Sequence, residues 1–333
     1  MNSHSRPLRL GTRASALARW QAEWVASRLR ERGIVVDLVL ITTTGDQHQA
    51  AIPGIGGEGV FTKEIQRALL DGRVDLAVHS LKDLPTGATP GLVLAAVPER
   101  AAVADALVCR EQEGKKGGEI HFSMSPDASA VGAGKDPRPL LRLPPGASIG
   151  TGSLRRRAQL LHARPDLHMK DVRGNVETRL GKLQQGDFDA LILAEAGLRR
   201  LGLAAHIAEV LPLGLMLPAV GQGALGLETR SDDAPTRQTV AVLDDPSTRA
   251  AVLAERAMLG RLQGGCLAPI AGLGQVERGQ LTLIGRVVSH DGAQLLEACQ
   301  TAPSFQAEML GLEVAEALLA QGAGEVVRAS RGA

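Results

Sequence analysis

The stretch VDLAVHSLKDLP, residues 74–85, decides how this chain folds. Its apolar, partly β-branched first half predicts a buried strand, and the run ends abruptly in charged residues before Pro85. In open α/β sheets, the carboxyl ends of the strands face the crevice in which ligands bind. Asp83 is therefore the first candidate for chemistry; the alternative is that it pairs with Lys82 or caps the next turn.

Further strands and helices are predicted around this strand. They are, in order, a strand at 8–13, a helix that ends at Gly33, a strand at 35–42, a helix at 60–70, the strand that ends at Asp83 and a strand at 92–97. The first helix is expected to bury Leu17, Trp20, Trp24 and Leu29 on one face. The alternation of strands and helices predicts parallel pairing with right-handed crossovers.

The same plan returns later in the chain. Strands are predicted at 147–153, 167–172 and 190–194, with a helix after each of the first two. Between Thr151 and Arg200 there are ten Lys and Arg residues against six Asp and Glu, and eight of the ten are Arg. Because the whole chain is nearly neutral, with 37 basic and 36 acidic residues, we expect a small polyanionic ligand and no nucleic-acid partner.

Two helix starts in this repeat are unusually basic. Arg155 and Arg156 lie in the first turn of one helix, and Arg173 and Arg179 lie around the start of the next. Cations at a helix N-terminus oppose the helix dipole, so we expect a bound carboxylate or phosphate near each start. Arg13, at the first strand-to-helix junction, is either a third anion contact or a solvated loop residue.

The C-terminal part is predicted to return to the first sheet and then to form a small α+β domain. The strand-like run at 219–230 would rejoin the first sheet, which implies two crossing segments and a hinged cleft. A helix at 250–262, a hairpin at 280–301 about Asp291-Gly292 and a helix at 310–319 should follow. Cys266 lies in a loop rich in glycine, and it is either an attachment point or nucleophile or an ordinary structural thiol.

Two loops are interpreted as lacking a catalytic role of their own. Residues 54–59, GIGGEG, fit the GxGxxG spacing of dinucleotide sites, but they follow Pro53 and a long polar loop instead of the first strand of a βαβ unit. We therefore favour a flexible loop, and a nucleotide-dependent enzyme stays a minor hypothesis that binding of a dinucleotide would revive. Residues 111–145 are interpreted as a linker that carries a mobile surface insertion.

The cysteines and the N-terminus indicate the compartment. The three cysteines are far apart and lack the spacing of a zinc site, so we expect no metal and a reducing environment. The N-terminus has no apolar signal segment, and nowhere are there eighteen uninterrupted apolar residues. We expect a cytoplasmic protein without membrane contacts, and a monomer, because no long apolar stripe predicts an obligate oligomer.

Five motifs, in order, resemble one family. VHSLKDLP, IGTGSLRRRAQL, DVRGNVETRLGKL, PAVGQGALGLE and GGCLAPI make the chain, from Leu8 to about Ser289, similar to the porphobilinogen deaminase (hydroxymethylbilane synthase) family. The resemblance implies two α/β domains like those of periplasmic binding proteins, with a double crossover and an interdomain cleft, and a small α+β third domain. The first domain would comprise residues 1–98 and 224–241. The second would comprise residues 105–217, including the insertion at about 111–145, and the third residues 246–333.

The resemblance also implies an activity. Such enzymes condense four porphobilinogen molecules head to tail into hydroxymethylbilane, in haem biosynthesis, and release ammonia. They do so on a dipyrromethane cofactor, which a thioether would attach here to Cys266, while Asp83 would be the catalytic carboxylate. The implied cofactor contacts are Arg13, Ser15, Asp46, Lys82, Thr151, Ser153, Arg155, Arg156 and Arg173. The implied substrate contacts are Arg13, Phe61, Arg173, Arg179 and Arg200.

This chemistry agrees with the residue types. Loss of ammonia leaves a cationic pyrrole that a carboxylate can stabilise, and each pyrrole brings two carboxylates for the arginines to bind. Two positions depart from the family pattern: Glu58 replaces a common Lys, and Gly152 replaces a common Ser. The competing hypothesis is a non-catalytic two-domain binding protein for a small polycarboxylate, which would require an export signal and would leave Cys266 without a role.

Overall fold

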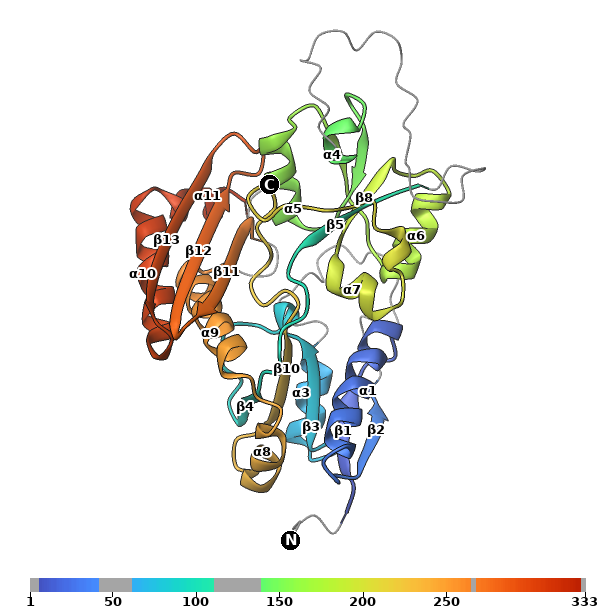
Figure 1. Ribbon diagram of the computed structural model, residues 1–333, viewed down its shortest axis with the longest axis vertical. Coiled ribbons are helices and arrows are strands. Elements are labelled where there is room, and N and C mark those ends of the chain that lie inside the picture. The colour runs from blue at the N-terminus through green and yellow to red at the C-terminus, as the bar shows by residue number, and fades with distance from the viewer. Residues whose placement is uncertain (1–5, 42–61, 111–138, 265–267, 331–333) are drawn as a thin grey trace.

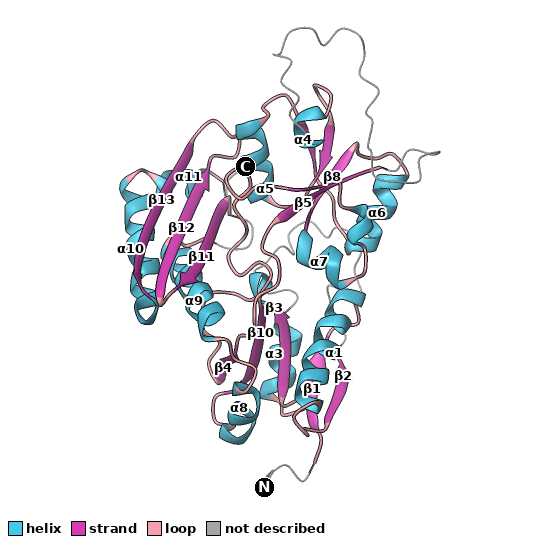
Figure 2. Cartoon of the chain, viewed as in Figure 1, coloured by secondary structure: helices cyan, strands magenta, loops and turns pink. Residues whose placement is uncertain are grey.

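The computed structural model describes residues 6–41, 62–110, 139–264 and 268–330. In this part of the chain, three sheets lie around a common centre, as Figure 1 shows. Two are five-stranded and mixed, and they occupy the two ends of the long axis, whereas the third is three-stranded and antiparallel and lies beside them. Helices flank each sheet (Figure 2). The predicted class, two α/β units and a smaller α+β unit, is confirmed.

The first sheet has the strand order β2-β1-β3-β10-β4. Its strands are β1 (Leu8–Thr12), β2 (Val36–Leu40), β3 (Leu76–Ser80), β4 (Leu92–Ala96) and β10 (Leu225–Arg230). Its helices are α1 (Ala16–Arg30), α3 (Lys63–Leu70) and α8 (Ala234–Ala241). β1 runs parallel to β2 and β3, whereas β10 runs antiparallel to β3 and β4. The predicted return of the late strand to this sheet is confirmed.

Helix α1 follows directly from β1, as predicted. The Ser15 hydroxyl accepts a hydrogen bond from the Ala18 N–H at 3.4 Å, and Leu29 is fully buried against the sheet. The prediction that Trp20 is buried is wrong, because 38% of it is exposed. Its ring faces α7 (Glu195–Arg200), where the Arg200 guanidinium lies 5.7 Å from the ring centroid.

The second sheet has the order β7-β6-β8-β5-β9. Its strands are β5 (Asp105–Cys109), β6 (Ser148–Gly150), β7 (His168–Lys170), β8 (Ala190–Ala194) and β9 (Glu209–Val210), and its further helices are α4 (Pro139–Arg142), α5 (Leu154–Ala163) and α6 (Val176–Gln184). The parallel pairing of β6 with β7 and β8 confirms the predicted repeat. The sequence did not predict β5, which is antiparallel to β8 and β9 and fully buried.

The predicted linker at 111–145 contains a helix at its end. Residues 111–138 lie outside the described part of the chain, but Leu140 of α4 and Leu143, just after it, lie in the core of the second sheet. The Leu140 N–H donates to the Glu209 carboxylate at 2.8 Å. The prediction that this stretch lacks regular structure throughout is therefore wrong at its C-terminal end.

The third sheet and its helices form the C-terminal part. The elements are α9 (Pro246–Arg261), β11 (Ile270–Glu277), β12 (Gln280–Val288), β13 (Leu295–Pro303), α10 (Ala307–Ala320) and α11 (Ala323–Ala329). The hairpin of β12 and β13 turns through Gly292, whose φ is 77° and which therefore favours glycine. β11 is a strand that the sequence pattern did not predict; it begins four residues after Cys266 and pairs with β12.

Helix α9 connects the third sheet to the first. Glu255, which is fully buried, binds Arg100 at 2.6 Å and accepts the N–H groups of Gly221 and Gly274 at 2.7 and 2.8 Å. These contacts join the chain after β4, the segment before β10 and strand β11. A buried charge with three good donors is well compensated, so removal of any donor would leave part of it unpaired.

The described residues contain neither a membrane-spanning helix nor a metal-binding cluster. The helices within them are too short or too polar to cross a bilayer. In the same ranges, no cluster of three or more His, Cys, Asp or Glu side chains is arranged to bind a metal ion. Cys109 and Cys299 are free thiols, and burial raises the pKa of Cys109 to about 12.

Candidate active site

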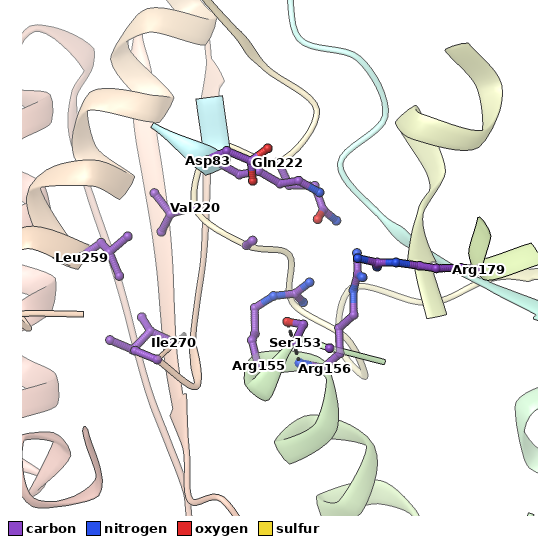
Figure 3. A pocket seen from close by; sticks show the side chains of 13 residues that line it. Asp83, Ser153, Arg155, Arg156, Arg179, Val220, Gln222, Leu259 and Ile270 are labelled. Atoms are coloured by element: carbon purple, nitrogen blue, oxygen red, sulfur yellow. Dashed lines mark hydrogen bonds between the residues drawn. The ribbon is translucent and has the colours of Figure 1, made fainter. Parts of the chain in front are cut away.

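Asp83 lies at the carboxyl end of β3, as predicted. The strand passes into a short 3₁₀ turn, η1 (Leu81–Asp83), which the Leu84 N–H closes by donating to the Leu81 carbonyl at 3.1 Å. This turn projects Asp83 into a cavity of about 190 Å³. Figure 3 shows Arg155 and Arg156 across the cavity from Asp83.

The cavity lies where the three sheets meet. Its lining residues are Lys82, Asp83, Gly152, Ser153, Arg155, Arg156, Arg179, Ala219, Val220, Gln222, Leu259, Ala268 and Ile270. They come from the η1 turn, the start of α5, helix α6, the segment before β10, helix α9 and the start of β11. A ligand in this cavity would therefore contact all three parts of the fold.

A second cavity of about 100 Å³ adjoins the first. It shares Lys82, Arg156 and Arg179 with the first cavity and extends between α1 and α7 to Arg200. The guanidinium of Arg200 donates to the Gly223 carbonyl at 2.7 Å and lies over the Trp20 ring, so α1 and the segment before β10 hold it in place. The three shared cations can contact a ligand in either cavity.

Arg155 and Arg156 are paired with a carboxylate that the sequence did not reveal. Asp105, at the start of β5 and fully buried, accepts from Arg155 Nη2 at 2.7 Å and from Arg156 Nε and Nη2 at 3.0 and 2.7 Å. The two guanidinium groups hold the pKa of Asp105 well below its usual range, despite the opposing effect of burial. The prediction that these first-turn arginines need a bound anion is thus corrected: Asp105 compensates one of the two charges.

Two residues that line this cavity each carry a buried polar atom without a hydrogen-bond partner in the described part of the chain. These atoms are Arg155 Nε and Gln222 Oε1. The Gln222 side-chain nitrogen donates to Asp105 at 2.9 Å and to the Val103 carbonyl at 2.8 Å. Its side-chain oxygen is therefore the atom that is left to accept a hydrogen bond from a ligand. Because an unmade buried hydrogen bond is unfavourable, this pair suits a ligand with both an acceptor and an N–H donor.

Burial makes Lys82, Arg179 and Arg200 easier to deprotonate. It lowers the pKa of Lys82 to about 8, with nearby Asp83 opposing this effect and Arg156 adding to it. It also lowers the pKa of Arg200 to about 10 and, with the charge of Arg156, that of Arg179. Negative charge on a ligand would reverse these shifts, so the site favours a polyanion.

Ser153 and Thr151 stabilise the start of α5. The Ser153 hydroxyl caps the helix by accepting from the Arg156 N–H at 3.5 Å, and the Thr151 hydroxyl accepts from the Ser153 N–H at 3.2 Å. Ser153 lines the first cavity, whereas Thr151 is buried and does not line it. Serine is a favourable residue at this position, because its hydroxyl satisfies an N–H group that the helix itself leaves free.

The structure gathers six of the predicted site residues around the first cavity: Lys82, Asp83, Ser153, Arg155, Arg156 and Arg179. Arg200 joins them through the second cavity. Arg13, Ser15, Thr151 and Arg173 line neither of these two cavities, and Arg173 forms a surface ion pair with Asp171 at 3.1 Å. Asp46, Phe61 and Cys266, as well as Glu58 and the 54–59 motif, lie outside the described residues.

Comparison with known proteins gives consistent matches. Residues 8–238 match the family model "Porphobilinogen deaminase, dipyromethane cofactor binding domain", and residues 249–320 match "Porphobilinogen deaminase, C-terminal domain". The porphobilinogen deaminase of Syntrophotalea carbinolica is 48% identical over 98% of this chain and 96% of its own. That of Geobacter metallireducens is 46% identical over 96% of this chain and 93% of its own.

The solved structures that resemble this chain have low sequence identity to it. An ABC transporter periplasmic substrate-binding protein from Coxiella burnetii has a TM-score of 0.41 and 15% identity, over 73% of this chain and 94% of its own. The BvgS VFT2 domain of Bordetella pertussis has a TM-score of 0.39 and 16% identity, over 70% of this chain and 84% of its own.

Proposed function

Because the chain belongs to the porphobilinogen deaminase family, as its five motifs predicted, we propose that the two cavities form the active site of such an enzyme. The enzyme is a transferase that condenses porphobilinogen into hydroxymethylbilane with release of ammonia, in haem biosynthesis, and it uses a dipyrromethane cofactor. The matches do not favour the alternative of a non-catalytic binding protein.

One observation carries the assignment of the site: among the described residues that line the first cavity, one carboxylate, Asp83, faces a cluster of cations. The substrate has the complementary charges, since each pyrrole carries two carboxylates and an N–H group. Arginine forks suit carboxylates, and a lone carboxylate suits positive charge that develops on the ring. The non-catalytic hypothesis explains the cations but gives Asp83 no role.

The residues present fit the cofactor. The unsatisfied Arg155 Nε is a donor for a ring carboxylate, and the unsatisfied Gln222 Oε1 is an acceptor for a pyrrole N–H. Lys82, Ser153 and Arg156 line the same cavity and would complete the binding site. When bound, the cofactor supplies the pyrrole ring to which the first substrate is joined.

Asp83 acts on the substrate through charge. As the amine leaves, positive charge spreads over the pyrrole, and the Asp83 carboxylate stabilises it while accepting the ring N–H. Arg179 and Arg200 would bind the substrate carboxylates, because they line the second cavity next to Lys82. Trp20 and the Gly223 carbonyl orient Arg200 for this task. Oriented cations fix the ring relative to Asp83, which lowers the entropic part of the barrier.

Some proposed roles rest on the family pattern alone. We assign the thioether to Cys266, and support comes from Ala268, two residues later in the sequence, which lines the first cavity. The contacts of Asp46 and Phe61 stay predictions of the same kind. So do contacts from Arg13, Ser15, Thr151 and Arg173, which would have to approach the ligand from beyond the two cavities.

We also propose the domain boundaries 1–98 with 224–241, then 105–217, then 246–333. Support comes from the sheets, because the strands of each sheet fall within one of these units. The two segments that cross between the larger sheets would then serve as the hinge of the cleft. We further propose that the enzyme is a cytoplasmic monomer; the two free thiols suit a reducing compartment.

Intact-mass spectrometry tests the proposed function. The purified chain should exceed its sequence mass by two pyrrole units, and the adduct should vanish in Cys266→Ala. The wild-type protein should consume porphobilinogen and release ammonia, whereas Cys266→Ala should bind porphobilinogen without turnover. A chain of unmodified mass that consumes no porphobilinogen after preincubation with it would refute the proposal.

A further inference from the structure

Arg256, on helix α9, contacts the backbone that follows Asp83. Its Nη1 donates to the Leu84 carbonyl at 2.9 Å, and its Nη2 donates to the Pro85 carbonyl at 2.7 Å. A guanidinium is planar and holds its donors in a rigid fork, so two bonds to consecutive carbonyls fix the direction of the chain as well as its position. Arg256 was not among the predicted site residues.

The turn that carries Asp83 is held from both sides. At its start, the Leu81 N–H donates to the Ala224 carbonyl of the segment leading into β10 at 3.0 Å. At its end, Arg256 holds the two carbonyls that follow Asp83. Asp83 itself is exposed to the cavity, so packing does not lock its side chain. The place of its carboxylate therefore depends on the backbone of the turn.

Helix α9 is a rigid support for this contact. Glu255, the preceding residue, is fully buried and binds Arg100, the Gly221 N–H and the Gly274 N–H. One turn later, Leu259 lines the cavity itself. The same helix thus contacts the Asp83 turn, the segment that carries Gln222 and the cavity wall.

We propose that Arg256 is a positioning residue of the reaction: it holds the Asp83 turn so that the carboxylate meets the pyrrole in the productive geometry. This inference rests on the proposed role of Asp83. The stabilisation of a developing charge falls steeply when the Asp83 carboxylate is moved away from it. A small shift of the turn should therefore lower kcat strongly and change the affinity for the substrate only slightly.

The chain offers a matched control. Arg249, on the same helix, also donates to two consecutive carbonyls, those of Leu94 and Ala95, at 3.4 and 2.9 Å, and it pairs with Asp244 at 2.7 Å. It lines neither cavity. Arg249→Ala therefore removes a comparable structural contact from the same helix without touching the Asp83 turn.

The test compares Arg256→Ala with Arg249→Ala in the cofactor-loaded enzyme. We expect both to lower the thermal midpoint, but only Arg256→Ala should lower kcat, by about ten- to a hundredfold, while its KM stays within about threefold. Arg256→Lys keeps the charge and most of the side chain but can hold only one carbonyl well, so it should fold like the wild type and recover part of kcat.

Two results would overturn the inference: a kcat for Arg256→Ala no lower than that of Arg249→Ala, or an Arg256→Lys variant that folds with unchanged midpoint and is no more active than Arg256→Ala. The mass of each variant separates this outcome from failure of the proposed function. If the wild type carries the adduct and turns over porphobilinogen, the function stands whatever Arg256 does.

Discussion

Arg155 Nη2 lies 2.7 Å from Asp105 Oδ2, and the two side chains are only 4% and 0% exposed. Arg156 binds the other carboxylate oxygen, so one buried anion separates two buried cations. Asp105 thus orients the side chains of Arg155 and Arg156 before a ligand binds. The three side chains together keep one net positive charge, which can interact with the ligand. Preorganised charges need no reorientation during the reaction.

Asp105→Asn should destabilise the fold. The amide keeps the shape of the carboxylate but leaves both guanidinium groups uncompensated, so the free energy of unfolding should fall by about 3 kcal/mol or more. The control, Asp166→Asn, breaks the more exposed pair with Arg164, where we expect about 1 kcal/mol or less. Urea unfolding measures both, and a loss below about 1 kcal/mol for Asp105→Asn would contradict the assigned role of the buried pair.

Local patterns were sufficient to predict most of the strands and the turn that presents Asp83. The apolar run that ends in charge before Pro85 specifies a strand and its exit, and Asp291-Gly292 specifies a hairpin. The return of β10 to the first sheet was predicted because a strand-like run at 219–230 is too isolated in the sequence to form a domain of its own. The arginines around the cavity were likewise predicted from their positions at helix starts.

Long-range pairing could not be predicted in the same way. Asp105 lies fifty residues before Arg155, and only the antiparallel insertion of β5 beside β8 brings them together. Arg256 and the Asp83 turn meet in the same manner, through docking of α9. The helical spacing of Trp20 predicted a buried side chain, but its ring contacts the guanidinium of Arg200, which lies on helix α7. Periodicity indicates which face is covered and not what covers it.

Asp83→Asn should keep the fold and lose turnover. The side chain is exposed to the cavity, so stability should not change measurably, whereas loss of its charge removes stabilisation of the cationic pyrrole. We expect kcat to fall by about a hundredfold or more. The control is Asp71→Asn, which removes a surface carboxylate that lines neither cavity. The kcat of each variant is measured from the steady-state consumption of porphobilinogen. A kcat of Asp83→Asn within about tenfold of the wild-type value would disprove the catalytic role of Asp83.

Lys82 should make stability depend on alkaline pH. Its pKa is about 8 in the folded chain, against an ordinary value of 10.5, so between these values the folded state has released a proton that the unfolded state still binds. The free energy of unfolding should therefore rise with pH across this window, relative to Lys82→Met. Below about pH 8 the lysine is charged in both states, so the difference should be constant there.

This measurement is best made in the Cys266→Ala background, because ligand carboxylates would raise the pKa of Lys82 again. The chain contains no tyrosine, which removes one group that would otherwise titrate at alkaline pH. Urea unfolding of the two proteins at several pH values gives the difference. If it stays flat up to about pH 10, the pKa of Lys82 is not lowered in the folded state.

Gly152→Ser, which restores the residue common in the family pattern, should be harmful in this chain. A Cβ at Gly152 would lie 2.9 Å from the Val172 carbonyl oxygen and 3.2 Å from Asp171 Oδ1, so the backbone after β7 would have to move. We expect a loss of about 1–3 kcal/mol in the free energy of unfolding. The KM for porphobilinogen should also rise, because Gly152 lines the first cavity.

The matched control is Gly181→Ser, in helix α6, where an added Cβ meets nothing within 4 Å. Serine is a better helix former than glycine, so this variant should gain about half a kcal/mol. Urea midpoints and KM values of the two variants, measured side by side, separate crowding at Gly152 from a general effect of serine. If Gly152→Ser unfolds at the wild-type urea concentration and binds porphobilinogen equally well, the backbone after β7 accommodates the side chain, and the missing hydroxyl needs another explanation.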